Sequence, residues 1–207
     1  MNYEVIERAA ERAAALLARP PVEVEASGRH AHLSREAVDI LFGRGYALTK
    51  QADLSQPGQF SCVERVGVSG PRGGFPSVTV LGPERGDTQI EISSTDAVAL
   101  GVPAVIRLSG DIAGSAPARL TGPAGELFIE QGVIVAMRHV HMTPGDAARY
   151  GVRDGRGVSV YLWGERSATF RNVIVRVSPN FAPRMHIDYD EANACGFYKG
   201  MAGFIES

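Results

Sequence analysis

The sequence contains little cysteine, few aromatic residues and almost no excess charge. It has two cysteines and one tryptophan in 207 residues, and its formal net charge is −2. Cys62 and Cys195 lie far apart and belong to no C-x-x-C motif, so two free thiols are favoured over a single disulfide, which stays the alternative. The near-neutral balance provides no basic surface of the kind that attracts nucleic acids or anionic membranes.

Long apolar runs and long helical patterns are also lacking. No apolar stretch reaches the roughly 20 residues that a membrane-spanning helix needs, and the first residues do not follow the basic, apolar and small-residue order of a secretory signal. The rest of the composition is ordinary for a globular protein, with 44% hydrophobic and 21% charged residues. The chain is long enough for one large or two small domains.

Short runs rich in valine and isoleucine occupy much of the chain. Many are bounded by glycine or proline, of which there are 24 and 12, as in β-proteins with many turns. The runs predicted to be strands are 22–25, 63–69, 77–81, 89–92, 105–108, 127–129, 133–137, 157–162 and 168–176. We therefore predict a mainly β, barrel-like architecture with short helices.

The first 18 residues have a different pattern. Apolar side chains recur at helical spacing on one face and charged side chains occupy the other. The apolar face comprises Val5, Ile6, Ala9, Ala13, Leu16 and Leu17. Pro20 and Pro21 end the predicted helix, because proline lacks the backbone donor and disfavours helix before it. The pattern is typical of a detachable docking segment and equally of a terminal helix packed on the body.

A weak internal repeat runs through the body of the chain. Its copies cover residues 32–43, 91–102, 141–152 and 186–197. Each copy predicts a strand end, a helix N-cap two residues later, an acid in the first turn and a terminal glycine. The strand-end residues are His32, Glu91, His141 and His186; the N-caps are Ser34, Ser93, Thr143 and Asp188; the acids include Asp96, Asp146 and Glu191. Equivalent local units are expected to bring the strand-end side chains toward one centre.

The five histidines are the strongest indication of chemistry. Four form the pairs His30/His32 and His139/His141, and the fifth is His186. Side chains at i and i+2 of a strand share a face, so both rings of a pair can reach one ion, and imidazole is a good ligand for Zn²⁺. Together with Glu91 they make six ligands. This number suits two ions with three protein ligands each, which leaves the open positions of catalytic sites. The alternative is ordinary core or surface histidines.

Two further residues need separate interpretation. The spacing from the first histidine pair to Glu36 also fits half of a cupin metal motif. Glu36, however, falls in the first turn of a helix capped by Ser34, so we interpret it as an acid that compensates the helix dipole, with a cupin as the minor alternative. Arg85 lies in a glycine-bounded turn before the strand of Glu91, where a guanidinium suits an oxyanion such as phosphate; the alternative is a solvated arginine.

Several longer motifs resemble one family. They are G-R-H-A-H-L-S at 28–34, A-D-L-S-Q-P-G-Q-F at 52–60, V-L-G-P-E-R-x-x-T-Q-I-E-I-S-x-T-D-A at 80–97, S-G-D-I-A-G-S at 109–115, G-V-I-V-A-M-R-H-V-H-M-T-P at 132–144 and M-H-I-D-Y-D-E-A-N-A at 185–194. The sequence resembles the phosphate propanoyltransferases, the PduL-type phosphotransacylases of bacterial microcompartments. The likeness runs from about residue 21 to residue 197.

The resemblance implies a fold and a set of site residues. The fold is two interleaved β-barrel domains with short capping helices, plus an N-terminal amphipathic helix. The implied segments are 1–20 as a docking (encapsulation) segment, 21–29 plus 136–207 as one barrel and 30–135 as the other. The implied ligands are His30, His32 and Glu91 for one zinc ion, and His139, His141 and His186 for a second. Arg85 is implied to bind phosphate, and Ser109 and Ala136 to lie along the coenzyme A groove.

The resemblance also implies an activity and a location. The reaction would convert a short-chain acyl-CoA (propanoyl-CoA or acetyl-CoA) and phosphate into acyl phosphate and coenzyme A, reversibly. Metal-bound phosphate would attack the thioester directly, without an acyl-enzyme. The implied location is the lumen of a microcompartment in the cytoplasm, with residues 1–18 binding shell or core proteins or driving self-association. Two alternatives stay open: a binuclear hydrolase of phosphate esters or thioesters, and a non-catalytic microcompartment component with structural metals.

Overall fold

The computed structural model describes residues 3–17 and 20–206, and the chain divides into two compact units. Unit 1 consists of Met1–Ala26, Arg138–Ile187 and Glu191–Ser207, and unit 2 of Ser27–Met137 with Asp188–Asp190. The main segment of unit 2, Ser27–Met137, is therefore an insertion in the sequence of unit 1. Positions 1, 2, 18 and 19 of the predicted docking segment lie outside the described residues.

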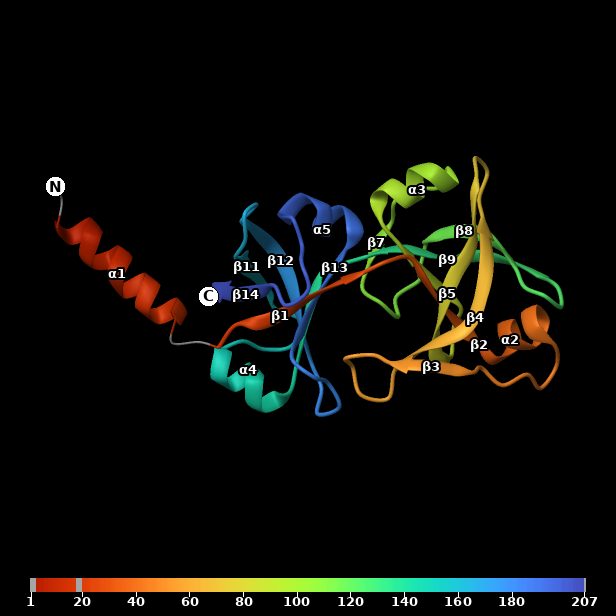
Figure 1. Cartoon of the computed structure of the whole chain (residues 1–207), viewed down its shortest axis with the longest axis horizontal. Helices are drawn as coiled ribbons and strands as arrows, with labels where there is room; N and C mark the ends of the chain where they lie inside the picture. Colours follow the sequence, from red (N-terminus) through yellow and green to blue (C-terminus); the bar gives the residue numbers. More distant parts are fainter. Residues whose placement is uncertain (1–2, 18–19, 207) are drawn as a thin grey trace. The chain divides into compact units, whose positions relative to one another are not determined.

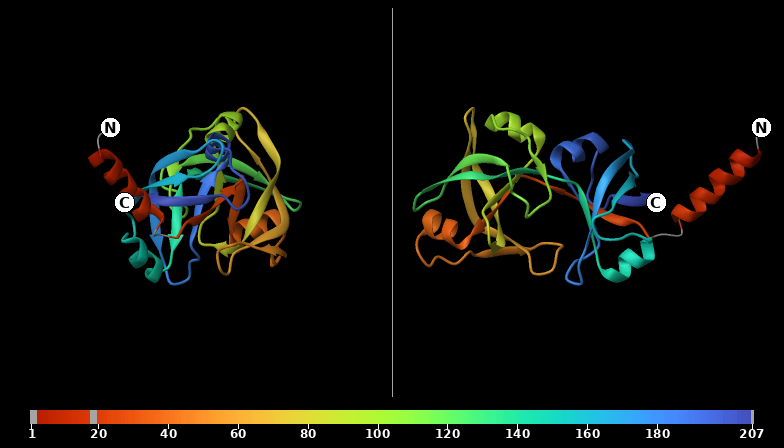
Figure 2. Two further views of the ribbon diagram at one scale, coloured as in Figure 1. Left: turned by 60° about the vertical axis from the view of Figure 1, so that its left-hand side comes forward. Right: turned by 180° about the vertical axis from the view of Figure 1, so that it is seen from behind.

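Unit 2 is built on a closed ring of strands (Figure 1). The strands follow the order β4 (Phe60–Ser69), β5 (Gly74–Arg85), β2 (His30–Ser34), β6 (Gln89–Ile92), β9 (Glu126–Ala136) and β8 (Ala116–Thr121), and β8 pairs back with β4. The short strands β3 (Lys50–Asp53) and β7 (Ile106–Arg107) extend the sheet at β4 and β9. Helices α2 (Arg35–Phe42) and α3 (Ser94–Leu100) lie on opposite sides of this barrel in Figures 1 and 2.

Unit 1 contains a second closed barrel. Its strands follow the order β1 (Val22–Ser27), β13 (Arg184–Asp188), β10 (His139–Met142), β12 (Ala168–Val177), β11 (Gly157–Leu162) and β14 (Ala202–Glu206). Pairing of β14 with β1 closes the ring. Helices α4 (Pro144–Tyr150) and α5 (Tyr189–Cys195) lie on opposite sides of it (Figure 2). The prediction of a mainly β protein with two interleaved barrels and short capping helices is confirmed.

Alternating burial explains why these sequences form barrels. Along β8 every second residue is buried and the others are exposed, the period-two pattern of a strand with one face in a core. The buried faces form one hydrophobic cluster in each unit. The interiors are tightly packed, because a side chain at Gly203 of β14 would place its Cβ only 2.9 Å from Val160 of β11.

Most predicted strands are present, with one correction. The bounds of β6 and β11 agree with the prediction. The runs 127–129 and 133–137, predicted as two strands, belong to the single strand β9. Gly132, which lies between these two runs, keeps the strand continuous with a positive φ of 140°, a conformation that glycine adopts without a steric penalty.

The predicted helix caps explain where the short helices begin. The side chains of Ser34, Ser93 and Thr143 each accept a backbone N–H of the following helix, as predicted. Asp96 and Asp146 complete capping boxes. The same turns therefore fix the end of each preceding strand, and with it the histidines and the glutamate that those strands carry.

In the second copy of the repeat the acid Asp96 also pairs with Arg29, the residue before His30, and the fourth copy makes an equivalent contact. Its acid, Glu191, forms an ion pair of 2.6 Å with Arg138. The side chain therefore ties α5 to the residue that precedes His139, where a capping-box role had been one of the predictions.

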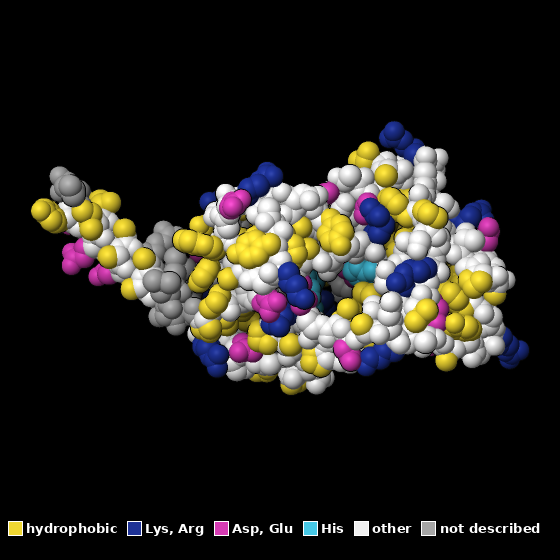
Figure 3. Space-filling model, viewed as in Figure 1, with side chains coloured by type: hydrophobic (Ala, Val, Ile, Leu, Met, Phe, Trp, Pro, Cys, Tyr) yellow, Lys and Arg dark blue, Asp and Glu magenta, His cyan; other side chains and the backbone are white. Residues whose placement is uncertain are grey.

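The N-terminal helix α1 (Tyr3–Leu17) is present as predicted. Val5 and Ile6 of its apolar face are 61% and 48% exposed. Figure 3 shows apolar side chains along this helix and acidic side chains gathered on a different side of it. Within the described part of the chain, none of the helices combines the length and the apolar character that a bilayer crossing requires.

Candidate active site

The first candidate metal centre lies in unit 2, where two neighbouring strands place three ligand side chains together. His30 and His32 project from the same face of β2, and Glu91 lies opposite His30 on the antiparallel strand β6. The atoms that these residues offer all lie within 4.8 Å of one another. The imidazole Nε2 atoms of His30 and His32 lie 3.5 and 3.7 Å from the Glu91 carboxylate. We call this group the His30/His32/Glu91 trio.

Burial and mutual charge set the protonation of this trio. Burial disfavours the charged ring of His30, but the Glu91 carboxylate and the Gly28 carbonyl beside it together outweigh this, so the pKa of His30 is raised. Burial, aided by the charges of His30 and Arg85, lowers the pKa of His32 to about 3. The charge of His30 and hydrogen bonds from His30 and Ser109 outweigh the burial of Glu91 and hold its pKa well below the usual range. Glu91 and His32 are thus in the carboxylate and neutral imidazole forms that bind metals, whereas the raised pKa of His30 means that a metal would displace a proton there.

Contacts outside the trio fix its orientation. The carbonyl oxygen of Gly28 lies 2.8 Å from Nδ1 of His30, which directs Nε2 toward Glu91. The hydroxyl of Ser109 donates to Oε1 of Glu91 over 2.6 Å. Such outer partners hold ligand side chains in place before a metal arrives.

Arg85 joins this network from the end of β5. Its Nη1 donates to the Ser109 hydroxyl over 3.0 Å, and that hydroxyl donates to Glu91. The residue predicted to bind phosphate is therefore one side chain removed from a predicted metal ligand. Ser109, predicted for the coenzyme A groove, is the side chain that links them.

The second candidate centre lies in unit 1. His139 and His141 project from one face of β10, and His186 lies opposite His139 on the antiparallel strand β13. Their ring centroids are 4.6, 4.9 and 5.1 Å apart, and their ligand atoms lie within 4.8 Å of one another. The Glu25 carboxylate lies 3.7 Å from Nδ1 of His186. We call this group the His139/His141/His186 trio.

Two residues considered in the sequence analysis, Ala136 and Glu36, belong to neither trio. Ala136 is the last residue of β9 and pairs with Arg107, which places it at the end of a strand of unit 2. Glu36 lies in the first turn of α2, and Glu91 takes the place next to the histidine pair that a cupin motif would give to Glu36.

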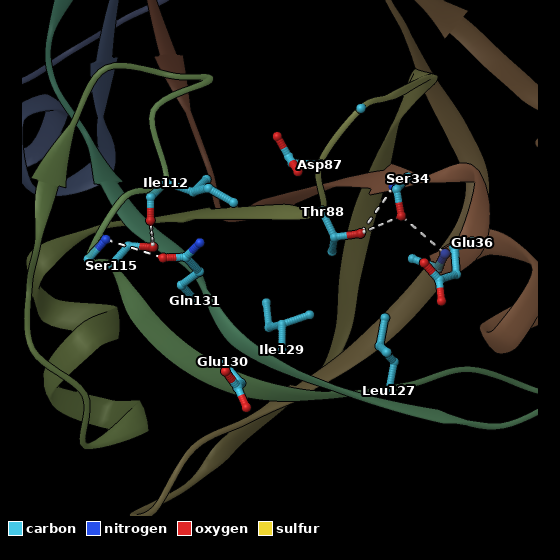
Figure 4. Close-up of a pocket in the computed structure, with 13 residues that line it drawn as sticks. Ser34, Glu36, Asp87, Thr88, Ile112, Ser115, Leu127, Ile129, Glu130 and Gln131 are labelled. Atoms are coloured by element: carbon cyan, nitrogen blue, oxygen red, sulfur yellow. Dashed lines mark hydrogen bonds between the residues drawn. The ribbon is translucent and has the colours of Figure 1, made fainter.

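A pocket of about 650 Å³ lies on unit 2 (Figure 4). Its lining comes from the start of α2, the turn that contains Asp87, the loop at Ile112–Ser115 and the middle of β9. The hydroxyls of Ser34 and Thr88 are hydrogen-bonded at its wall. The acids Glu36, Asp87 and Glu130 line it, so it disfavours phosphate, and none of the six candidate metal ligands contributes to it.

The comparisons with known proteins agree with one another. The family model described as phosphate propanoyltransferase matches residues 23–198. A protein of Clostridioides difficile named phosphate propanoyltransferase is 53% identical and covers 89% of this chain and 88% of its own. Proteins of the same name from Listeria monocytogenes and Thermotoga maritima are 52% and 47% identical. They cover 99% and 90% of this chain, and 97% and 89% of their own.

Proposed function

The chain belongs to the phosphate propanoyltransferase family and is an acyltransferase, and we propose that it converts a short-chain acyl-CoA and phosphate into acyl phosphate and coenzyme A. Propanoyl-CoA and acetyl-CoA are the proposed acyl donors, and the reaction runs in either direction. The observation that carries the proposal is the chain of hydrogen bonds from Arg85 through Ser109 to Glu91, because it couples an anion-binding guanidinium to a metal-type ligand set.

The donor chemistry of both trios fits divalent metal ions. Each trio offers three nitrogen or carboxylate ligand atoms within 4.8 Å, the donor set and number that catalytic zinc sites use. We propose one Zn²⁺ or similar ion at each trio, with the metal set by ligand type and supply. When bound, such ions neutralise phosphate charge and polarise carbonyl oxygens.

Arg85 is the proposed phosphate-binding residue. A guanidinium carries five N–H donors in a planar fork, so Arg85 is able to engage Ser109 and phosphate oxygens together. Ser109 restrains the side chain at Nη1. Holding phosphate and thioester in one geometry contributes much of the rate enhancement of a two-substrate reaction.

The proposed transfer is a direct displacement. A phosphate oxygen forms a bond to the thioester carbonyl carbon, the carbon–sulfur bond breaks, and its electron pair leaves with the coenzyme A thiolate. A thiol is acidic enough, with a pKa of about 8.5 in the cysteine analogue, for the thiolate to leave without a proton donor.

The two cysteines support a route without an acyl-enzyme. Both are free and buried. Burial raises the pKa of Cys195 and raises that of Cys62 to about 11, and the thiolate is the nucleophilic form. Neither side chain is suited to attack a thioester.

Ser109 and Ala136 are proposed to line the coenzyme A groove. The side chain of Ser109 is already engaged by other residues. The hydroxyl of Ser109 donates to Glu91 and accepts from Arg85. Contact of Ser109 with coenzyme A is therefore proposed through its main chain.

Residues 1–20, which include the N-terminal helix α1, are proposed to form a docking segment. Its exposed Val5 and Ile6 are suited to the apolar groove of a partner protein. We propose microcompartment shell or core proteins as partners and the microcompartment lumen as the location.

The test is a metal-analysed assay across a series of acyl-CoA chain lengths. The proposal expects coenzyme A release that requires phosphate and matches acyl phosphate formed, loss of activity after chelation with the fold retained, and recovery on adding Zn²⁺. Coenzyme A release at the same rate without phosphate would instead identify a hydrolase. Full activity after complete metal removal would exclude the metal-dependent mechanism.

A further inference from the structure

Gln89 is a buried polar residue beside the His30/His32/Glu91 trio that has no assigned role. Its exposed fraction is 2%. It lies on β6 two residues before Glu91 and opposite His32, so Gln89 and Glu91 share a face of the strand. The side chain thus lies among the ligands without being a ligand itself.

The side-chain amide of Gln89 has three defined partners. Its Nε2 donates to Oε1 of Glu91 over 2.6 Å and to the hydroxyl of Ser109 over 3.1 Å. Its Oε1 accepts the backbone N–H of Gly110 over 2.8 Å. These partners determine the orientation of the amide, because a flipped amide would place its oxygen against a carboxylate and its NH₂ group against an N–H donor.

Gln89 also determines where Ser109 sends its proton. The Ser109 hydroxyl accepts hydrogen bonds from Gln89 and from Arg85. A hydroxyl has two lone pairs and one proton, so the proton is left for Oε1 of Glu91, 2.6 Å away. Oε1 therefore receives two donors, and Oε2 is the oxygen nearest to His30.

We infer that Gln89 is the positioning residue that orients the Glu91 carboxylate for metal binding and joins it, through Ser109, to Arg85. This inference rests on the proposed function of the trio as a metal centre. A buried carboxylate held at one oxygen by two donors is ordered before the ion arrives. Loss of such an outer partner lowers metal affinity by about 10- to 100-fold.

The test compares metal affinities of the full chain and its variants by chelator competition with Zn²⁺. Gln89→Met keeps the approximate length and removes both donors, and Gln89→Glu keeps the shape but replaces the donor with a second carboxylate. The expected result is two tight equivalents in the parent protein. In each variant one equivalent weakens about 10- to 100-fold, while the other, from the His139/His141/His186 trio, is unchanged. The exposed Gln131 provides the matched controls Gln131→Met and Gln131→Glu, which should keep both.

The outcomes separate this inference from the function on which it rests. A parent protein that binds no Zn²⁺ would remove the metal centre itself, and the role of Gln89 with it. Two unchanged equivalents in both Gln89 variants would overturn only the positioning role. A third outcome is that both Gln89 variants bind Zn²⁺ more weakly at both sites and no longer unfold cooperatively on heating. This would assign Gln89 to folding and overturn the inference as well.

Discussion

His30 and Glu91 lie directly opposite each other on the antiparallel strands β2 and β6. His139 and His186 have the same relationship on β10 and β13 in the other barrel. In each barrel the strand with the histidine pair is parallel to its second neighbour, β5 or β12. The two candidate centres are therefore built by one local topology used twice, with glutamate in one copy where the other has histidine.

Single ligand substitutions should each remove one metal equivalent. His32→Ala deletes a ligand of the first trio and His141→Ala a ligand of the second, and each leaves the other trio intact. We expect a fall from two equivalents to one in each variant, measured by elemental analysis of the dialysed protein. Retention of two equivalents in either variant would contradict its assignment as a ligand.

Replacement of Arg85 should affect phosphate more than metal. Arg85→Ala removes charge-assisted hydrogen bonds that contribute about 1.5–3 kcal/mol, so kcat/KM for phosphate should fall roughly 10- to 100-fold. Metal content should stay near the parent value. Steady-state kinetics with varied phosphate and elemental analysis provide the two measurements.

Arg119→Ala is the matched control for Arg85, because Arg119 forms an exposed ion pair with Glu126 in the same unit. It should leave both quantities unchanged. Equal losses of phosphate use and metal content in Arg85→Ala would contradict a direct role in phosphate binding.

The cysteines should be dispensable for catalysis. Cys195→Ser should retain kcat within about twofold, because the burial that raises the pKa of this thiol also withholds it from the thioester. Native protein at pH 8 should react with a thiol reagent only as it unfolds, since the pKa of Cys62 is about 11. Complete loss of activity in a folded, metal-loaded Cys195→Ser variant would indicate an acyl-enzyme.

Glu64 should make stability depend on pH. Its carboxylate accepts the Tyr46 hydroxyl over 2.8 Å and the backbone N–H of Thr49 over 3.1 Å. Although burial opposes ionisation, these hydrogen bonds lower the pKa of Glu64. A carboxylate with a lowered folded-state pKa contributes its stability above the unfolded value of about 4.3, and loses it as the pH falls through the folded value.

Glu64→Gln should therefore reduce the free energy of unfolding by about 1–3 kcal/mol at pH 7. The difference from the parent protein should shrink as the pH falls below about 4. Denaturant titrations at several pH values measure this. Glu126→Gln, on an exposed ion pair, should change stability by at most about 0.5 kcal/mol, and a difference for Glu64→Gln that grows at acid pH would refute the explanation.

The N-terminal helix should affect docking and leave catalysis unchanged. Val5→Asp with Ile6→Asp places charge on the exposed apolar face of α1, which should abolish co-sedimentation with microcompartment shells while kcat/KM stays at the parent value. Glu4→Gln with Glu7→Gln alters the charged face and should retain docking. Normal co-sedimentation of the aspartate variant would exclude this face as the docking surface.

Periodicity and turn residues predicted much of the fold. The Val/Ile runs located β4, β5, β6 and β9 of the unit 2 barrel and β1, β11 and β12 of the unit 1 barrel. Ser34, Ser93 and Thr143 identified the starts of three helices. The strands β3, β8 and β14 were not predicted. The four residues of β3 are all exposed and lack a Val/Ile run, while Pro117 and Gly203 weaken the strand patterns of β8 and β14, which packing in the barrels then stabilises.

The candidate ligands were recognisable in the sequence, but their surroundings were not. Spacing placed the H-x-H pairs on single strand faces, and the ligand atoms of each trio lie within 4.8 Å of one another; their role as metal ligands stays a prediction. The bond from Ser109 to Glu91 depends on the conformation of the loop after β7, which no local pattern specifies. The position of Gln89 beside Glu91 could have been predicted, because residues at i and i+2 of a strand share a face, as in the histidine pairs.

The insertion of unit 2 within unit 1 has a consequence for biosynthesis. Residues 27–137 leave the ribosome before β13 and β14 exist, and domains generally fold as they emerge. The inserted barrel is therefore able to complete its own ligand set while the enclosing barrel still waits for His186 and for the last strand, which closes on β1. A nascent chain arrested near residue 180 would contain all three residues of the His30/His32/Glu91 trio and only His139 and His141 of the other.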